Sequence, residues 1–423
     1  MSNPPKSRNH GVALIDPYGI YGTRTAARLR NMRRRRRAQQ VILGLIVLVL
    51  IGFGIYSLRT HRIPTIKSNA SWSLLVSPSA TPAWDSEDQN LLIPTRDGQI
   101  VASWPFAHPA HSRILLETDF PIHGTPVLGE KYFYTGSENG ALYAVDRETG
   151  KLIWQYNSGA SISTQPQVLG NLIFCGNDDG WLFCLRTKNG KLVWKRKLPS
   201  AIGNGLATVS EPSKLVLAPL TDGAAQRGGV WALDANNGLV KWKFPAKGVT
   251  NAQQITPPVT ADIDGKTRVF CANDTGALIN LNAANGKYGG SDDGWKVYFQ
   301  NEKDSASRLL LRQPPLLEPQ TSPTRLYLTG NDDVVRCVDI YNGRLLWKWQ
   351  SPTIITGNVQ LAEGQLLIPC RGSVSYLLNT NTGDVDATLA GSKFPFVSML
   401  RVAQHVWAID SNGTLSRFSL SNP

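Results

Sequence analysis

The sequence predicts an all-β fold, an eight-bladed β-propeller of four-stranded antiparallel blades preceded by a single transmembrane helix. Three observations lead to this prediction. A motif that ends in tryptophan recurs at intervals of roughly forty residues, a second turn of the Asx-Gly type recurs with it, and one long apolar segment lies near the N-terminus. A fixed repeat of this length is typical of arrays in which each unit buries one face on its neighbour.

The first motif is clearest in residues 144–154, which read AVDRETGKLIW. An alternating strand precedes the aspartate, whose side chain can accept hydrogen bonds from N–H groups of the turn, and the glycine adopts a positive φ at little cost. The tryptophan then offers a flat apolar face to the next unit. The residues expected to dock blade on blade are Asp146, Gly150 and Trp154; Gly190 and Trp194, with Arg186 in the Asp position; Asp234, Gly238 and Trp242; and Asp339, Gly343 and Trp347.

Degenerate copies of this motif are Asn282 with Gly286, and Asn379 with Gly383, the latter without the tryptophan. A second turn lies upstream in each unit, as in residues 138–140 and 178–180. Two strands joined by an Asx-Gly turn are a strong hairpin signal, so each unit reads as a meander of about four strands. Counting these turns gives eight units, and eight such blades make a propeller.

Charge is distributed very unevenly along the chain. Residues 1–40 contain ten Lys or Arg and a single acid, Asp16, which leaves 34 basic and 30 acidic residues in the rest of the sequence. The high pI therefore belongs to an N-terminal tail, and the propeller itself gives no reason to expect nucleic acid as a partner.

Residues 41–58 are uncharged and apolar, and eighteen such residues are just long enough to span a bilayer. The arginines at 33–37 on the N-terminal flank predict that the tail stays in the cytoplasm. A cleaved signal peptide fits less well, because no A-x-A site follows closely. We expect a basic cytoplasmic tail at 1–40, a transmembrane signal anchor at 41–58, a linker at 59–70, and a periplasmic propeller at 71–423, tethered to the inner membrane.

The two ends of the predicted propeller are each incomplete. Residues 71–76 read SWSLLV and resemble an outer strand with its tryptophan, Trp72, but the rest of a unit is missing. The last unit stops after residues 414–418, one strand short. We therefore expect the strand at 71–76 to complete the last blade and to close the ring without a covalent bond, with Trp72 at a docking position. Closure would hide the sheet faces and edges that an open ring exposes.

The five cysteines all fall on predicted strands. A hairpin centred on Asp179 and Gly180 predicts that Cys175 lies directly opposite Cys184. Two interpretations stay open, namely that both are small buried hydrophobic residues, or that they form a cross-strand disulfide outside the cytoplasm. The sequence has no CxxC or zinc-like pairing, and we expect no metal site.

The largest insertion in the repeat covers residues 287–312. Loops on a rigid scaffold are the usual place for binding. We therefore expect a protein partner to bind the propeller, with this rim as the first candidate and the central funnel as the second.

The A-x-D-x-x-T-G-x-x-x-W unit resembles the tryptophan-docking repeat of the PQQ-type eight-bladed propellers, over about residues 71–423. Two kinds of protein carry this repeat: quinoprotein dehydrogenases, and non-enzymatic bacterial proteins similar to the BamB outer-membrane assembly factor. In both, the resemblance implies that the tryptophans lock adjacent blades.

The resemblance implies two functions, and the residues of this sequence fit one of them better than the other. Quinoprotein alcohol dehydrogenases have a vicinal Cys-Cys pair above the quinone and long insertions that supply calcium ligands and a catalytic Asp, whereas no two cysteines are adjacent here. We therefore expect no catalytic residue and no cofactor, and a membrane-anchored scaffold that acts in cell-envelope assembly. A PQQ- and calcium-dependent dehydrogenase is the alternative. The acylated N-terminal Cys of the assembly factor has no counterpart before Cys175, which implies tethering to the inner membrane.

Overall fold

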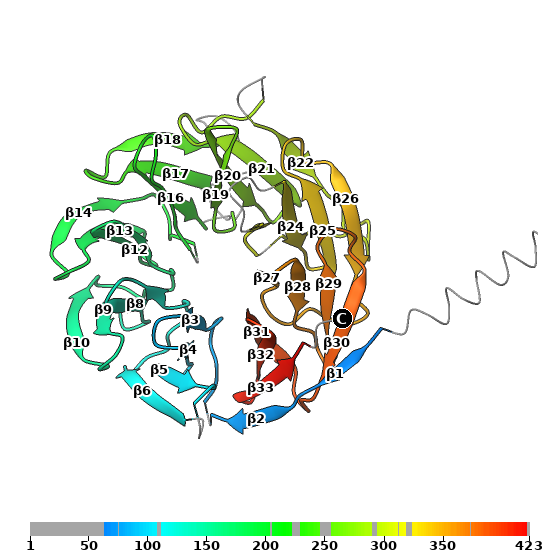
Figure 1. Ribbon diagram of the computed structural model, residues 1–423. Coiled ribbons are helices and arrows are strands. Elements are labelled where there is room, and N and C mark those ends of the chain that lie inside the picture. The colour runs from blue at the N-terminus through cyan, green and yellow to red at the C-terminus, as the bar shows by residue number, and fades with distance from the viewer. Residues whose placement is uncertain are drawn as a thin grey trace, which may run out of the picture. The chain divides into compact units, whose positions relative to one another are not determined.

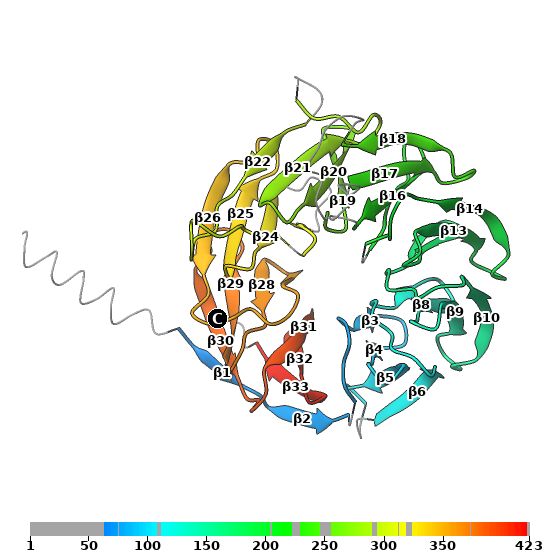
Figure 2. The same ribbon diagram turned by 180° about the vertical axis from the view of Figure 1, so that it is seen from behind.

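The computed structural model describes residues 63–74, 76–107, 111–203, 205–221, 229–245, 255–289, 294–311, 313–318, 324–372 and 374–420. The chain divides into two units, residues 1–62 and 63–423, and the second unit is the propeller. All regular structure in the described residues is β, in eight sheets arranged as a ring (Figures 1 and 2). The predicted eight-bladed all-β propeller is confirmed.

The predicted membrane span at 41–58 and the basic tail at 1–40 lie outside the described residues. In the part of the chain that the structure does describe, no helix is long and apolar enough to cross a bilayer.

Each blade is an antiparallel meander in which the strands follow in order from the channel to the outside. Blades 1 to 4 are β3 (Ala83–Asp85), β4 (Asn90–Pro94), β5 (Gln99–Trp104) and β6 (His111–Glu117); β7 (Val127–Leu128), β8 (Tyr132–Gly136), β9 (Ala141–Asp146) and β10 (Leu152–Asn157); β11 (Gln167–Leu169), β12 (Leu172–Gly176), β13 (Trp181–Arg186) and β14 (Leu192–Lys197); β15 (Ala207–Val209), β16 (Leu215–Leu220), β17 (Gly229–Asp234) and β18 (Val240–Phe244).

Blades 5 to 8 follow the same plan. They are β19 (Val259–Ile263), β20 (Lys266–Ala272), β21 (Ala277–Asn282) and β22 (Lys296–Tyr298); β23 (Leu316–Leu317), β24 (Arg325–Thr329), β25 (Val334–Asp339) and β26 (Leu345–Gln350); β27 (Gln360–Ala362), β28 (Gln365–Ile368), β29 (Val374–Asn379) and β30 (Val385–Ala390); β31 (Phe396–Val402), β32 (His405–Asp410) and β33 (Thr414–Ser419).

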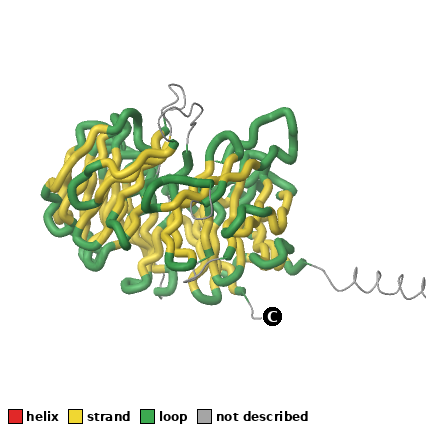
Figure 3. The backbone as a smooth tube through the Cα atoms, turned by 90° about the horizontal axis from the view of Figure 1, so that it is seen from above, coloured by secondary structure: helices red, strands yellow, loops and turns green. Residues whose placement is uncertain are grey.

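A strand's place in its blade decides how deeply it is buried. The second and third strands are buried on both faces, as in β12, where all five residues are buried. Outermost strands alternate between exposed and half-buried residues, as in β14. The apolar faces of neighbouring blades pack on each other, and one cluster joins Leu217 and Trp242 of blade 4 to Val269 of blade 5. Figure 3 shows the strands running between loops at the two faces of the ring.

The N-terminal strands run along the outside of the last two blades (Figure 1). β2 (Ala70–Ser73) lies antiparallel to β33 and supplies the fourth strand of blade 8. It occupies the place for which the sequence predicts a closing strand at 71–76. Pairing continues past β2, since the N–H of Leu74 donates to the carbonyl of Gly413 over 3.1 Å.

Residues 59–70 are not only a linker. β1 (Thr65–Lys67) lies parallel to β30 and adds a fifth strand to blade 7. The outer edge of β30 would otherwise present unpaired N–H and C=O groups, and three residues of β1 cover part of it. The sequence gives no repeat signal for this strand, because it has no counterpart in the other blades.

Candidate interaction surface

The two faces of the ring carry different turns. Because neighbouring strands are antiparallel, the turns after the first and third strands of a blade lie at one end of the sheet. The turn after the second strand and the connection to the next blade lie at the other end. We name the first end the docking rim and the second the connecting rim; in blade 2 they carry residues 129–131 with 146–151, and residues 137–140, respectively.

The predicted aspartates organise the docking-rim turns. A carboxylate oxygen of Asp146 accepts hydrogen bonds from the N–H of Thr149 over 2.8 Å and from its hydroxyl over 2.7 Å. These bonds favour the ionised form and hold the pKa of Asp146 below its ordinary value. Asp234 and Asp339 accept from the backbone N–H two residues further on, at 2.9 Å and 2.8 Å. The aspartates therefore order these turns.

The predicted docking tryptophans contact the next blade in one common geometry. The indole N–H of Trp154 donates to the carbonyl of Thr187 over 2.8 Å, and its ring lies against Gly190, whose φ is +67°. A Cβ on Gly190 would lie only 2.7 Å from the ring, so the position requires glycine. The same pairs recur as Trp194 with Ala235 and Gly238, Trp242 with Ala283 and Gly286, and Trp347 with Thr380 and Gly383.

Blade 5 also has a docking tryptophan, which sequence reasoning missed. The indole of Trp295 donates to the carbonyl of Ile340 over 3.1 Å and lies against Gly343. Nine positions separate it from Gly286, where other blades have four, because the turn carries an insertion. The signal in the sequence is that Trp295 is followed directly by the alternating residues 296–299, KVYF, as the other docking tryptophans are followed by strand residues.

The insertion at 287–312 is therefore not one loop. β22 pairs with β21 and crosses from one face of the ring to the other, so residues 287–289 and 294–295 belong to the docking rim and residues 299–311 to the connecting rim. The second part is held to blade 6, where the N–H of Glu302 donates to Asp332 over 3.1 Å and Lys303 forms an ion pair with Asp333.

Trp72 does not dock in the manner of the other tryptophans. It lies opposite Leu415 and stacks on Trp407 of its own blade, with ring centroids 5.6 Å apart. It also packs on the cluster that joins blades 8 and 1, which includes Leu91 and Val101. Trp72 is thus part of the closing interface, but its indole stacks on Trp407 of β32 in its own blade rather than on a glycine of the next blade.

Blade 1 has no docking tryptophan in the described residues, and an ion pair takes its place. Leu115 packs on Gly150, and Arg147 of blade 2 reaches the buried Asp85 of blade 1, with Nε 2.7 Å from Oδ2. Burial opposes ionisation of Asp85, but the hydrogen bonds from Arg147 and the turn N–H groups outweigh it, so its pKa lies below the ordinary value.

The cysteine prediction is corrected by the register of blade 3. Cys175 lies opposite Phe183 and Cys184 lies opposite Phe174, one residue away from the predicted pairing. A shift of one residue moves a side chain to the other face of a sheet. Cys175 accordingly packs with blade 2 and Cys184 with blade 4, and both are free thiols. Burial raises the pKa of Cys184 to about 12, which keeps its thiol protonated.

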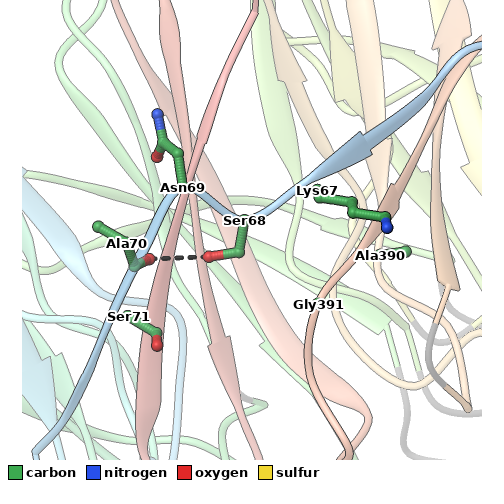
Figure 4. A pocket seen from close by; sticks show the side chains of 7 residues that line it. All are labelled: Lys67, Ser68, Asn69, Ala70, Ser71, Ala390 and Gly391. Carbon is green, nitrogen blue, oxygen red and sulfur yellow. Dashed lines mark hydrogen bonds between the residues drawn. The ribbon is translucent and has the colours of Figure 1, made fainter.

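Recesses lie between blades and at the closing seam. On the docking rim, a cavity of about 480 Å³ lies between blades 5 and 6 beside Trp295 and Tyr341, and one of about 280 Å³ lies between blades 4 and 5 beside Pro212. An open groove of about 500 Å³ follows the step from β1 to β2 along residues 67–71, where the Ser68 hydroxyl donates to the carbonyl of Ala70 (Figure 4). Within the described residues, no three His, Cys, Asp or Glu side chains gather as metal ligands would.

Comparison with known proteins gives the chain a family. A family model described as outer membrane protein assembly factor BamB matches residues 87–296 and 226–393. The structure of BamB from Moraxella catarrhalis has the same fold, with a TM-score of 0.62 and 16% identity over 84% of this chain and 99% of that one. Sqt1 from Saccharomyces cerevisiae aligns with a TM-score of 0.68 and 13% identity over 84% and 99%.

One relative is an enzyme. Tetrathionate hydrolase of Acidithiobacillus ferrooxidans is 23% identical over 303 residues, which cover 69% of this chain. The chain matches only 50% of that relative's length. The family model, by contrast, covers most of the propeller, and its repeat is the one that the docking contacts display. The chain therefore belongs to the family of PQQ-type propellers that the BamB model describes.

Proposed function

We propose that this chain is a membrane-anchored β-propeller that works outside the cytoplasm as a non-enzymatic scaffold for protein partners, in assembly of the cell envelope. The observation that carries the proposal is the match of the BamB family model to residues 87–296 and 226–393. The blade interfaces support it. In six of them a glycine packs on a side chain of the preceding blade, a tryptophan in five and Leu115 in one, and these contacts make the ring a rigid body that can hold turns in fixed positions.

Anchoring is proposed from the N-terminal sequence. The apolar segment 41–58 follows a basic tail, and the first residue of β1 is Thr65. Residues 59–64 can span at most about 20 Å when extended, so a propeller tethered in this way stays beside the bilayer. We place the tail in the cytoplasm and the propeller in the periplasm because basic residues flank the N-terminal side of the segment.

Photocrosslinking in native membranes tests the scaffold role. The two parts of the insertion offer exposed positions on opposite faces, Tyr288 on the docking rim and Ser305 on the connecting rim. A photoreactive residue at each should capture a protein of the envelope-assembly machinery from at least one face, while the same group at Asn171, an exposed turn in blade 3, serves as the matched control. Equal capture at all three positions, or none at either test position, would contradict the proposal.

The second candidate is an enzyme, and the specific observation in its favour is the similarity to tetrathionate hydrolase. A quinoprotein reaction fits the residues poorly. The five cysteines include no adjacent pair, Cys175 and Cys184 lie on opposite faces of one sheet, and the described residues form no cluster of calcium ligands. Turnover of tetrathionate by the purified full chain, or dye-linked oxidation of an alcohol or sugar after addition of PQQ and Ca²⁺, would contradict the non-enzymatic role.

A further inference from the structure

The direction of β1 fixes the side from which the chain enters the propeller. β30 begins just after the docking-rim turn at residues 379–384 and runs towards the connecting rim. β1 is parallel to it, with Thr65 beside Thr388 and Lys67 beside Ala390. Ile63 and Pro64 therefore lie on the docking-rim side of β1. The described chain therefore enters the propeller from the docking-rim side.

The docking rim of blade 3 carries an uncompensated positive charge. Residues 180–210 contain six Lys or Arg and no acid. Arg186, Lys188 and Lys191 lie in or beside the turn between β13 and β14. We name these three residues the blade 3 cationic surface. The two acids of this blade, at 178–179, lie in its connecting-rim turn.

The charge of this surface is not neutralised by neighbours. Among the residues that the structure describes, none of these three side chains forms an ion pair. Lys195, further along β14, lies over the ring of Trp181 at 5.0 Å, towards the connecting rim, and is not part of this surface. Blade 4 differs, because Lys241 is 3.3 Å from Asp234 there. Like charges that remain exposed without acids favour an anionic partner.

Aliphatic side chains accompany the cations at the same rim. Leu152, Leu192 and Leu239 follow the docking-rim turns of blades 2, 3 and 4, and their exposed fractions are 45%, 44% and 55%. Lys151 and Lys191 directly precede two of them. A cation beside an exposed aliphatic chain on blades 2 and 3, with a third exposed leucine on blade 4, suits a flat partner with anionic groups above an apolar layer.

We propose that the docking rim of blades 2 to 4 rests on an anionic lipid surface. Headgroup phosphates pair with the blade 3 cationic surface, and Leu152, Leu192 and Leu239 reach the boundary of the acyl chains. A bilayer accounts for both observations at once, since the chain enters from this rim and the blade 3 part of the rim is positively charged. The orientation rests on the proposed membrane anchor, whereas the affinity of the rim for anionic lipid does not.

Lipid-attached quenchers test this contact in the full chain. All five native thiols are buried, so a single introduced cysteine can be labelled with a fluorophore. The pair is Leu192→Cys on the docking rim and Asp179→Cys in the exposed connecting-rim turn of the same blade. In nanodiscs that contain anionic lipid, a quencher on the lipid headgroups should quench the label at 192 and spare the label at 179. Equal quenching at both positions would overturn the proposal.

A charge variant separates lipid attraction from simple proximity. K188Q with K191Q should lower the ratio of lipid-bound to free rim by about 25-fold, because each lost charge lowers it about fivefold. The matched control, Arg96→Gln with Lys393→Gln, removes the same charge from exposed positions on the connecting rim and should leave quenching unchanged. An equal effect of both double variants, or quenching that is as strong on neutral lipid, would overturn the proposal.

Flotation distinguishes this inference from the proposed function. If the full chain does not stay with membranes at high salt, the anchor is wrong. Quenching of the label at 192 compared with 179 on anionic vesicles then tests the rim, because the basic tail at 1–40 also attracts anionic lipid. If the chain stays anchored but quenching at 192 needs an added protein fraction, the rim binds an acidic protein and the lipid proposal fails.

Discussion

Each docking indole makes two different contacts at the blade interface. The ring packs on a glycine with positive φ, and the N–H donates to a carbonyl of the same turn, as Trp154 does with Gly190 and Thr187. The first contact removes a large apolar area from water, and the second satisfies a donor that would otherwise be buried without a partner. Asp146 orders the turn of its own blade by accepting hydrogen bonds from Thr149. One copy of the motif therefore supplies the turn that receives the preceding blade and the tryptophan that packs on the next blade.

Trp295 should stabilise the ring as much as the tryptophans at regular spacing. Replacing it with Ala should lower the free energy of unfolding by about 3–5 kcal/mol, as for other large core aromatics, because the contact with Gly343 and the bond to Ile340 are both lost. Urea unfolding measures this. Tyr298→Ala, at a side chain that is 64% exposed, is the control and should change stability by less than about 0.5 kcal/mol. Equal effects of the two substitutions would show that Trp295 does not dock.

The thiols should be inert in the folded chain. Burial raises the pKa of Cys271 and Cys337 to about 12, as it does for Cys184, so almost no thiolate exists near neutral pH. An aromatic disulfide reagent should titrate no thiol in the native protein and five after denaturation without reductant. A count of three after denaturation would reveal a disulfide that the register of blade 3 does not permit.

At the residue scale, the sequence predicts well whatever repeats at constant spacing. Trp194, Trp242 and Trp347 could be assigned because four positions separate each from its glycine. Trp295 could not, since an insertion changes its spacing. The pairing of Cys175 with Cys184 was wrong because turn residues fix a hairpin only to within one residue, and that one residue decides the face of the sheet.

The interface of blades 1 and 2 is held by a buried ion pair between Asp85 and Arg147 instead of by a docking tryptophan. Asp85, at the end of β3, is fully buried, and Arg147 also donates to the carbonyls of Gly129 and Glu130 at 2.9 Å and 3.1 Å. A buried ion pair of this kind is costly to break, because the partner left behind is a desolvated charge.

Replacing one partner of this ion pair should destabilise the protein more than replacing both partners. Asp85→Asn should cost about 3–5 kcal/mol of stability, since it leaves the guanidinium of Arg147 without its anion. The double variant Asp85→Leu with Arg147→Met should cost less than the single one, because no charge remains buried. Thermal or urea unfolding of both gives the comparison. Additive losses would mean that the two side chains stabilise the interface independently.

The same pair makes the ring sensitive to acid. The folded pKa of Asp85 lies below its unfolded value, near 4, so its contribution to stability is complete above about pH 4 and is lost as the pH falls through the folded pKa. Asp332, paired with the buried Arg336, has a lowered pKa too and acts in the same direction. Unfolding free energies measured between pH 7 and pH 2 should fall only at the acid end, and less steeply in Asp85→Asn. A decline that begins above pH 5 would point to other groups.

At the element scale, strands within a repeat could be predicted and strands outside it could not. The meanders follow from alternating residues and Asx-Gly turns, whereas β1 covers an edge that exists only after blade 7 has folded. The insertion was likewise assigned to one rim, although β22 divides it between the two faces. Both cases depend on contacts between segments far apart in the sequence.

At the scale of the whole molecule, the most important feature is the position of β2. β2 comes near the start of the propeller sequence and is the outermost strand of the last blade, so the N-terminal segment is part of the same folded unit as β33 (Figure 2). A force on the N-terminus is then transmitted to blades 7 and 8 through β1 and β2. An anchor attached at this point holds a closed ring rather than a free end.

The central claim is that this ring is displayed outside the cytoplasm, and thiol accessibility in cells tests it most directly. Asp179→Cys places one exposed thiol on the propeller, and Ser7→Cys places one in the tail. In cells whose outer membrane has been made leaky, a reagent that cannot cross the inner membrane should label position 179 at once and position 7 only after that membrane is opened. Labelling of position 179 only after the inner membrane is opened would contradict the account.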